Sequence, residues 1–184
     1  MNPQSNKPIM GIVQDSLLGT MLMTSRDTFI THEDLMNLVM WIDDLDAIPQ
    51  PAILKPKPLW TGKQVFSLVM PRLQYMRFNE TPKSHNWASS KDKNILIHNG
   101  DILCGQLTSA QVGKTGGGIV HIIWKEFGCE AVKSFLSQSQ CVINNWLMLH
   151  GMTVGVSDII AREKTMALIR STLHKQLSKV QKIV

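Results

Sequence analysis

The sequence predicts an α+β fold in which a small, mainly antiparallel sheet is preceded by helices and followed by a C-terminal helical segment. Three observations predict it. Apolar residues recur at helical spacing near both ends of the chain, short β-like runs fill residues 63–124, and an Asn-Gly pair separates two of those runs. The 184 residues, 43% of them hydrophobic, are enough to bury a core, which argues against wholesale disorder.

Two core-packing helices are predicted near the N-terminus. The first follows from apolar residues that recur at roughly helical spacing between residues 12 and 22. The second begins at Thr31, whose hydroxyl can cap it while Asp34 stands three residues further on. Its buried face is expected to consist of Leu35, Leu38, Val39 and Ile42.

Residues 48–60 are predicted to be irregular but ordered. Prolines at positions 49, 51, 56 and 58 force an extended course, because proline fixes φ and restricts the residue before it. The apolar side chains expected to anchor this segment are Ile53, Leu54, Leu59 and Trp60.

The central sheet is predicted from runs of apolar, β-like residues. Asn99-Gly100 lies between two of them and predicts a type I′ hairpin, a turn that needs positive φ at both central residues. The polar stretch 78–94 is expected to be a surface loop in which only Trp87 can tuck beneath the surface. The β-like runs are residues 64–70, 94–100, 101–107 and 118–124.

The pattern returns to helix after Trp124. Apolar residues from 127 to 147 fit one long helix or two helices that end near Gly151, with Cys129 and Cys141 expected in a helix interior. Ser157 or Asp158 is a candidate cap for a last helix from about Arg162. That helix carries a narrow apolar seam that needs a partner helix: Met166, Ile169, Leu173, Leu177, Val180 and Val184.

The net charge of +5 is confined to the end of the chain. Residues 1–161 contain 13 basic and 13 acidic residues, whereas residues 162–184 contain six basic residues and one acid. A neutral body argues against a nucleic-acid-binding surface spread over the whole domain. Three cysteines favour a reduced compartment, and the sequence offers no signal-peptide pattern and no apolar run long enough to span a membrane.

The residues contain no complete active site. Gly113-Lys114-Thr115 resembles the end of a phosphate-binding loop, but Thr108 stands where the first glycine is needed, and the following segment is predicted to be a strand instead of a helix. Asp43, Asp44 and Asp46 can in principle hold magnesium, but their position between a helix and a proline-rich segment is typical of a solvated turn. The spacing of the histidines and cysteines predicts no zinc site.

Long strings of the sequence resemble the largest subunit of eukaryotic DNA-directed RNA polymerase, and RNA polymerase II most of all. The strings follow the family's order over almost the whole chain: PQSNKPIMGIVQDSLLG at 3–19, SRDTFI at 25–30, PAILKPKPLWTGKQVFS at 51–67, GGGIVHIIWKEFG at 116–128 and NNWLMLHGMTVGVSDII at 144–160.

The resemblance implies that residues 1–157 are the pore domain of that subunit and that residues 158–184 begin the funnel domain with the first of two paired funnel helices. The chain would then be a piece of a longer, nuclear subunit that lines the passage for nucleotides and backtracked RNA. The family's DFDGD-type aspartates, which hold the catalytic magnesium, are absent from this sequence. We therefore expect no catalytic residue, no metal ligand and no cofactor in this segment, and no RNA synthesis by the chain alone.

The resemblance also implies partners and candidate site residues. Partners would be the rest of the subunit, other polymerase subunits, the DNA template, the RNA transcript, nucleoside triphosphates and a transcript-cleavage factor, with no membrane. Asn6 and Gln14 match family positions near the RNA 3′ end, although Asn6 can also cap a turn and Gln14 can be a helix surface residue. Ser109 and Ala110 stand where relatives often carry two lysines, which leaves Lys114 as the nearest replacement.

Two other functions remain open from the residues. One is a nucleotide-binding enzyme that uses Gly113–Thr115. The other is a nucleic-acid-binding adaptor that uses the basic C-terminal helix, residues 162–184.

Overall fold

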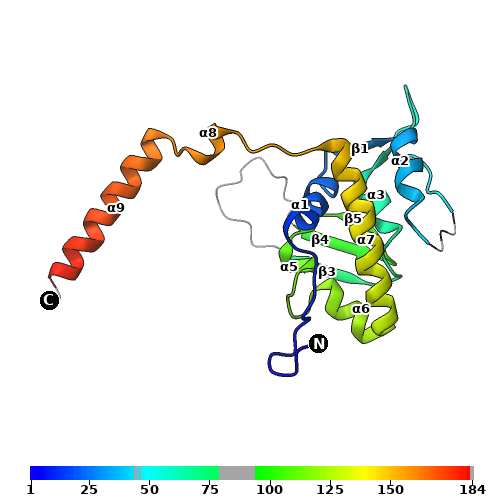
Figure 1. Cartoon of the computed structure of the whole chain (residues 1–184), viewed down its shortest axis with the longest axis horizontal. Helices are drawn as coiled ribbons and strands as arrows, with labels where there is room; N and C mark the ends of the chain where they lie inside the picture. Colours follow the sequence, from blue (N-terminus) through cyan, green and yellow to red (C-terminus); the bar gives the residue numbers. More distant parts are fainter. Residues whose placement is uncertain (44, 46, 79–93, 183–184) are drawn as a thin grey trace. The chain divides into compact units, whose positions relative to one another are not determined.

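The computed structural model describes residues 1–43, 45, 47–78 and 94–182 and divides the chain into two compact units, Met1–His150 and Gly151–Val184. The first unit combines two small antiparallel sheets with helices (Figure 1). This confirms the predicted α+β class. The second unit consists of a short helix α8 (Val156–Ile159) and a long helix α9 (Glu163–Gln181).

The N-terminal helices form as predicted, with one difference in which side chains are buried. Helix α1 (Gln14–Met23) turns Gly19, Thr20 and Met23 to the core, while its leucines are only partly buried. A small residue is needed there, because a Cβ on Gly19 would lie 2.4 Å from Ile143 Cγ2 of α7. Helix α2 (His32–Val39) begins at Thr31, whose hydroxyl accepts a hydrogen bond from the Asp34 N–H as predicted.

The proline-rich segment is held by a few specific contacts. Trp60 is buried, and its indole N–H donates to the Pro49 carbonyl oxygen over 2.7 Å. Ile53 and Leu59 exchange backbone hydrogen bonds, and strand β2 (Leu59–Thr61) pairs with β1 (Phe29–Thr31). Leu54 was wrongly predicted as an anchor, since 72% of it is exposed.

Strands β3 (Tyr75–Phe78), β4 (Asn94–His98) and β5 (Asp101–Cys104) form an antiparallel sheet in the order β3-β4-β5. The strands β4 and β5 were predicted, whereas β3 was not. The hairpin between β4 and β5 has φ values of 53° at Asn99 and 88° at Gly100, as the type I′ turn requires. The predicted loop at 78–94, with Trp87, lies outside the described residues except at its two ends.

Two segments predicted as strands are helices. Residues 64–70 belong largely to α3 (Gly62–Ser67), because Thr61 and Gln64 form a capping box that starts a helix there. Residues 118–124 belong to α6 (Ile119–Phe127), where Ile119, Val120 and Ile123 are buried at helical spacing. A short apolar run does not by itself distinguish a buried strand from a buried helix.

Helix α7 (Cys129–His150) is the longest element of the first unit and packs against α1, α2 and α6 (Figure 1). Its buried side chains include Phe135, Ile143 and Trp146. The rings of Phe135 and Phe66 meet edge to face with centroids 6.3 Å apart. Cys129 and Cys141 lie in the helix but are exposed, so the expectation of an interior position was wrong.

Helix α9 has no covering partner within the described residues. Its seam residues Met166, Ile169, Leu173, Leu177 and Val180 are 39–60% exposed, and Val184 lies outside the described residues. Neither Ser157 nor Asp158 caps α9, because the N-cap residue of α9 is Arg162, and no side chain bonds to the start of the helix. Asp158 instead accepts from the Gly155 N–H at the start of α8. None of the described helices is long and apolar enough to cross a membrane.

Replacing Tyr75 with phenylalanine is expected to raise the free energy of unfolding by about 1 kcal/mol. Tyr75 is 6% exposed, and its hydroxyl has no hydrogen-bond partner among the described residues. Thermal denaturation measures the change.

The contrasting variant is Thr24→Val, because the buried Thr24 hydroxyl donates to the Thr20 carbonyl oxygen and accepts from the Leu107 N–H. Thr24→Val should lower the free energy of unfolding by about 1–3 kcal/mol. A loss of stability in Tyr75→Phe would contradict this view of the hydroxyl.

Candidate nucleic-acid interface

The segment before α1 runs antiparallel to the loop between α5 (Ser109–Val112) and α6. The Ile12 N–H donates to the Val112 carbonyl oxygen over 2.9 Å. Gly11 packs closely against Gly113, because a Cβ on Gly11 would be only 2.6 Å from the Gly113 carbonyl carbon. Further along, the side chain of Lys7 lies beside Gly116. We call these two adjoining segments, residues 6–14 and 112–116, the interface strip.

The three predicted site residues all belong to this strip and are exposed. Asn6 lies within a turn that is closed by the Asn2 N–H, which donates to the Lys7 carbonyl oxygen over 2.8 Å, and its own N–H donates to the Asn2 carbonyl oxygen over 2.9 Å. The side chain that bonds to this turn is that of Asn2, which accepts from the Gln4 N–H. Gln14 is the first residue of α1, and Lys114 follows Gly113, so that residues 100 positions apart in sequence come from two adjoining segments.

The backbone is strained at two of these residues. Asn6 has a φ of 48° and Gln14 a φ of 51°, both in the left-handed region. Asparagine adopts that region more easily than glutamine does, and a strained residue of this kind persists only where the surrounding structure enforces it. Such residues cluster at functional sites, so the strain at Gln14 marks the start of α1 as a candidate site.

The glycine-rich loop does not form the phosphate-binding loop of nucleotide enzymes, although one reason for rejecting that function was wrong. The loop is followed by helix α6 and not by a strand. However, the GKT sequence follows the short helix α5, and α6 begins only at Ile119, four residues after Thr115. Lys114 is therefore not in the first helical turn, where a P-loop lysine stands. The Gly117 N–H is instead bonded to Nδ1 of His121 over 3.1 Å.

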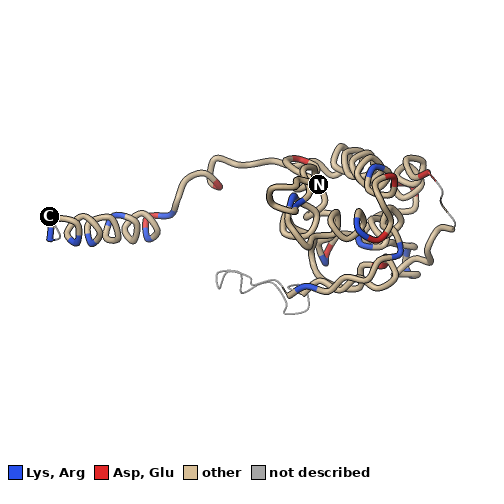
Figure 2. The backbone as a smooth tube through the Cα atoms, turned by 90° about the horizontal axis from the view of Figure 1, so that it is seen from below, with Lys and Arg blue, Asp and Glu red and all other residues tan. Residues whose placement is uncertain are grey.

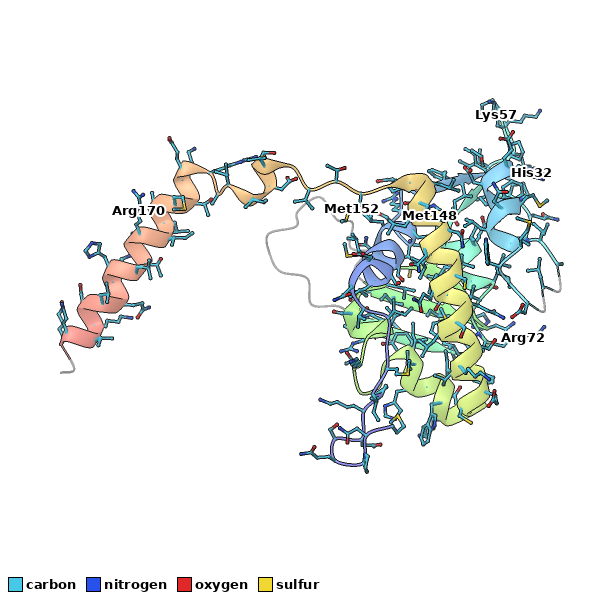
Figure 3. All side chains as sticks on the ribbon, viewed as in Figure 1. His32, Lys57, Arg72, Met148, Met152 and Arg170 are labelled. Atoms are coloured by element: carbon cyan, nitrogen blue, oxygen red, sulfur yellow. The ribbon has the colours of Figure 1, made fainter. Side chains whose placement is uncertain are left out.

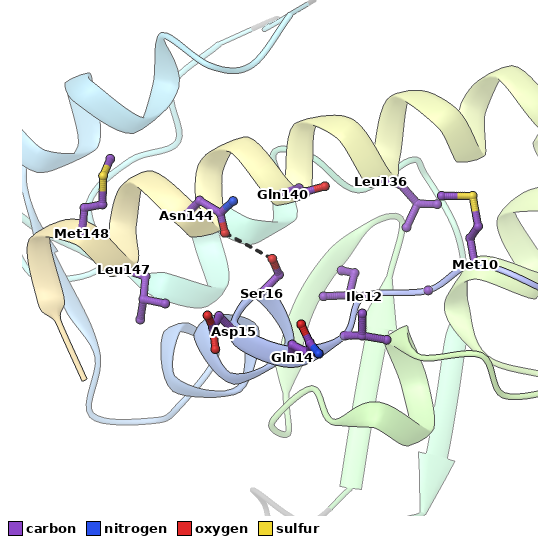
Figure 4. A pocket seen from close by; sticks show the side chains of 12 residues that line it. Met10, Ile12, Gln14, Asp15, Ser16, Leu136, Gln140, Asn144, Leu147 and Met148 are labelled. Atoms are coloured by element: carbon purple, nitrogen blue, oxygen red, sulfur yellow. Dashed lines mark hydrogen bonds between the residues drawn. The ribbon is translucent and has the colours of Figure 1, made fainter. Parts of the chain in front are cut away.

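A pocket of about 570 Å³ adjoins the strip, between residues 10–16 and helix α7 (Figure 4). Its apolar surface comes from side chains such as Ile12, Leu136 and Leu147. Its polar side chains are Gln14, Asp15, Ser16, Gln140 and Asn144. The Ser16 hydroxyl donates to Asn144 Oδ1 over 3.2 Å and so connects the two walls.

The charges near the pocket are arranged unevenly. Among the described residues, no lysine or arginine lines it, and Asp15 is the one ionisable side chain in the lining. Lys7 and Lys114 lie outside it on the interface strip. Arg77 is bonded to helix α5, because its guanidinium donates to the Ala110 carbonyl oxygen over 2.9 Å.

No metal centre is formed by the described residues, which hold no group of three histidine, cysteine or acidic side chains close enough to bind an ion. Asp43 accepts from the Gln138 side-chain amide over 3.3 Å. Asp44 and Asp46, the other members of the acidic turn, lie outside the described residues.

Sequence reasoning found Asn6, Gln14 and Lys114 but not the α7 wall of the pocket. Gln140 and Asn144 are separated from Gln14 by more than half of the chain. Their spacing of four residues places both on one face of α7 and is the only signal in the sequence that they act together.

The fold and the interface strip define a chain that presents exposed amide and lysine side chains on an α+β unit. The family model described as RNA polymerase Rpb1, domain 3, matches residues 1–159, and the chain belongs to this family. The predicted membership in the largest-subunit family of DNA-directed RNA polymerase is thereby confirmed.

One relative shows how the chain compares with a complete subunit. The chain is 39% identical over 183 residues to the DNA-directed RNA polymerase II subunit RPB1-B of Trypanosoma brucei brucei. The alignment covers 100% of this chain but 10% of that relative. The chain thus spans about a tenth of the length of the subunit it matches.

Proposed function

We propose that this chain is part of the catalytic largest subunit of a DNA-directed RNA polymerase, of the RNA polymerase II type, and that it acts in the nucleus. Residues 1–157 form the pore domain, and residues 158–184 begin the funnel. The subunit as a whole carries out nucleotidyl transfer, and this segment lines the passage for nucleoside triphosphates and backtracked RNA. Its partners are the other polymerase subunits, template DNA, the transcript and a cleavage factor.

The observation that carries the proposal is the interface strip. Two segments that are far apart in sequence, and that both match the family model, lie side by side and carry the exposed residues Asn6, Gln14 and Lys114. Amide groups hydrogen-bond to nucleotides without adding charge, and a lysine attracts phosphate. The described residues do not fit magnesium, so we propose that the catalytic metal is held by another segment of the subunit.

Helix α9 fits the funnel part of the proposal. Lys and Arg recur along it (Figure 2). Its apolar seam is exposed. In the polymerase the seam packs on a second funnel helix, and the basic side chains remain at the channel entrance, where positive charge draws in anions. If α9 is instead the nucleic-acid-binding element of an adaptor, removal of residues 162–184 abolishes RNA binding. In the proposed function this removal mainly lowers self-association.

The chain alone is expected to bind single-stranded RNA weakly and to synthesise none in the presence of magnesium. Lys114→Ala should lower the slope of log affinity against log salt by about one, because one phosphate contact is lost. Fluorescence anisotropy over a salt series measures this. Lys57→Ala is the matched control, since it removes the same charge at the proline-rich segment (Figure 3). Template-directed nucleotide incorporation by the chain alone, or equal slopes for both variants, would contradict the proposal.

A further inference from the structure

The pocket between residues 10–16 and α7 has a composition unlike that of a phosphate site. Nucleic-acid backbones are bound mainly through lysine and arginine, and neither lines this pocket. The one charged side chain in the lining, Asp15, repels phosphate. A ligand that enters the pocket therefore presents an uncharged surface.

The side chains of the pocket suit a flat, polar-edged group. Leu136 and Leu147, which are partly buried, and the exposed Met10 and Met148 supply apolar surface on which a planar ring can lie. Gln14, Gln140 and Asn144 add side-chain amides, each able to donate and to accept hydrogen bonds. Asn and Gln amides are the groups that pair with two edge atoms of a nucleobase at once. The volume of about 570 Å³ is within the range of small-ligand pockets.

The amides are available for a ligand. Among the described residues, the side chains of Gln14 and Gln140 have no hydrogen-bond partner, and both are exposed at the pocket. Asn144 uses its oxygen to accept from Ser16, which fixes the orientation of the amide and leaves its NH₂ group to donate. Figure 4 shows Asn144 and Ser16 facing each other across the pocket, with Gln140 one turn away on the same helix.

The backbone of Lys114 lies next to a residue that lines the pocket. Gly11 lines the pocket, and a Cβ at this position would lie 2.9 Å from the backbone nitrogen of Lys114. The phosphates that flank an inserted base can therefore be neutralised by a cation just outside the pocket. A peptide ligand is less favoured, because both walls lack an exposed strand edge to which an extended peptide could be added.

We propose that this pocket binds an unpaired base of single-stranded RNA, with the amides of Gln14, Gln140 and Asn144 at the edge of the base and Lys114 at an adjacent phosphate. The proposal rests on the proposed function, because it names the part of the RNA that the channel surface takes up. It adds a second wall, on α7, to the surface formed by the interface strip.

The test compares two ligands that share a backbone. The full chain, labelled with ¹⁵N, is titrated at low salt with a short single-stranded oligoribonucleotide and with an abasic version that has the same number of phosphates. We expect the base-bearing oligonucleotide to bind about fivefold more tightly and to shift the side-chain amide signals of Gln140 and Asn144. The abasic oligonucleotide should shift signals around Lys114 alone.

Variants separate base binding from phosphate binding. Gln140→Met removes the amide at nearly constant shape. It should lower the affinity for the base-bearing oligonucleotide alone, by about fivefold. Gln138→Met, on the same helix but outside the pocket, should change neither affinity. Lys114→Ala should lower the affinities for both oligonucleotides by the same factor.

The outcomes distinguish the two proposals. Equal affinities for the two ligands, with shifts confined to Lys114, overturn the base pocket and leave the proposed function standing. The absence of binding by either ligand overturns both proposals. Binding of the base-bearing ligand that Gln140→Met does not weaken also overturns the base pocket.

Discussion

Replacing Gly11 with alanine is expected to lower the free energy of unfolding by about 2–3 kcal/mol. A methyl carbon at this position would lie 2.6 Å from the carbonyl carbon of Gly113 and 2.9 Å from the backbone nitrogen of Lys114. Both atoms belong to the backbone, so no side chain can rotate to make room, and the two segments of the interface strip must separate. Urea denaturation measures the loss.

A second glycine of the same loop provides the control. A Cβ at Gly116 would lie 3.4 Å from Cγ of Lys7, which is the flexible part of an exposed side chain. Gly116→Ala should therefore change the free energy of unfolding by less than about 0.5 kcal/mol. Gly11→Ala should also weaken RNA binding more than Gly116→Ala does, because it separates Lys114 from Gln14. Equal stabilities of the two variants would contradict the close packing of the strip.

Replacing Phe135 with alanine is expected to cost about 3–5 kcal/mol of stability, the usual result of emptying a buried aromatic site. Phe135 is 2% exposed and packs edge to face on Phe66, which joins α7 to α3. Its loss leaves a cavity where the helix that carries Gln140 and Asn144 meets the rest of the core. Denaturation followed by tryptophan fluorescence measures the change.

Phe127 is the matched control for Phe135. It is the last residue of α6, and 43% of it is exposed. Phe127→Ala removes the same atoms without creating a closed cavity, so its cost should stay below about 1.5 kcal/mol. If Phe127→Ala lowers the free energy of unfolding as much as Phe135→Ala does, the difference in burial between the two side chains is contradicted.

The features that could be predicted from the sequence are those decided by neighbouring residues. The cap at Thr31 depends on Asp34, three residues away, and the hairpin depends on the positive φ values that Asn99 and Gly100 adopt. Both formed as predicted, because local hydrogen bonds and local backbone preferences determine them.

Several of the predictions that failed depended on distant contacts, whereas the wrong strand at 64–70 overlooked the local capping box of Thr61 and Gln64. Residues 118–124 form an apolar run whose periodicity fits either a buried strand or a buried helix, and packing against α7 decides for the helix. The same holds for the pocket. Gln14 was found through a family resemblance, but Gln140 and Asn144 join it only because Gly19 lets α1 approach Ile143 of α7.

The central claim is that the interface strip faces RNA inside an assembled polymerase. A photoreactive amino acid at position 114, in the polymerase that contains this chain, tests it most directly when elongation complexes are backtracked on a template. We predict that labelled RNA is cross-linked near its 3′ end from position 114, and that the same group at position 57 gives no cross-link. Cross-links from position 57 with none from position 114 would contradict the claim.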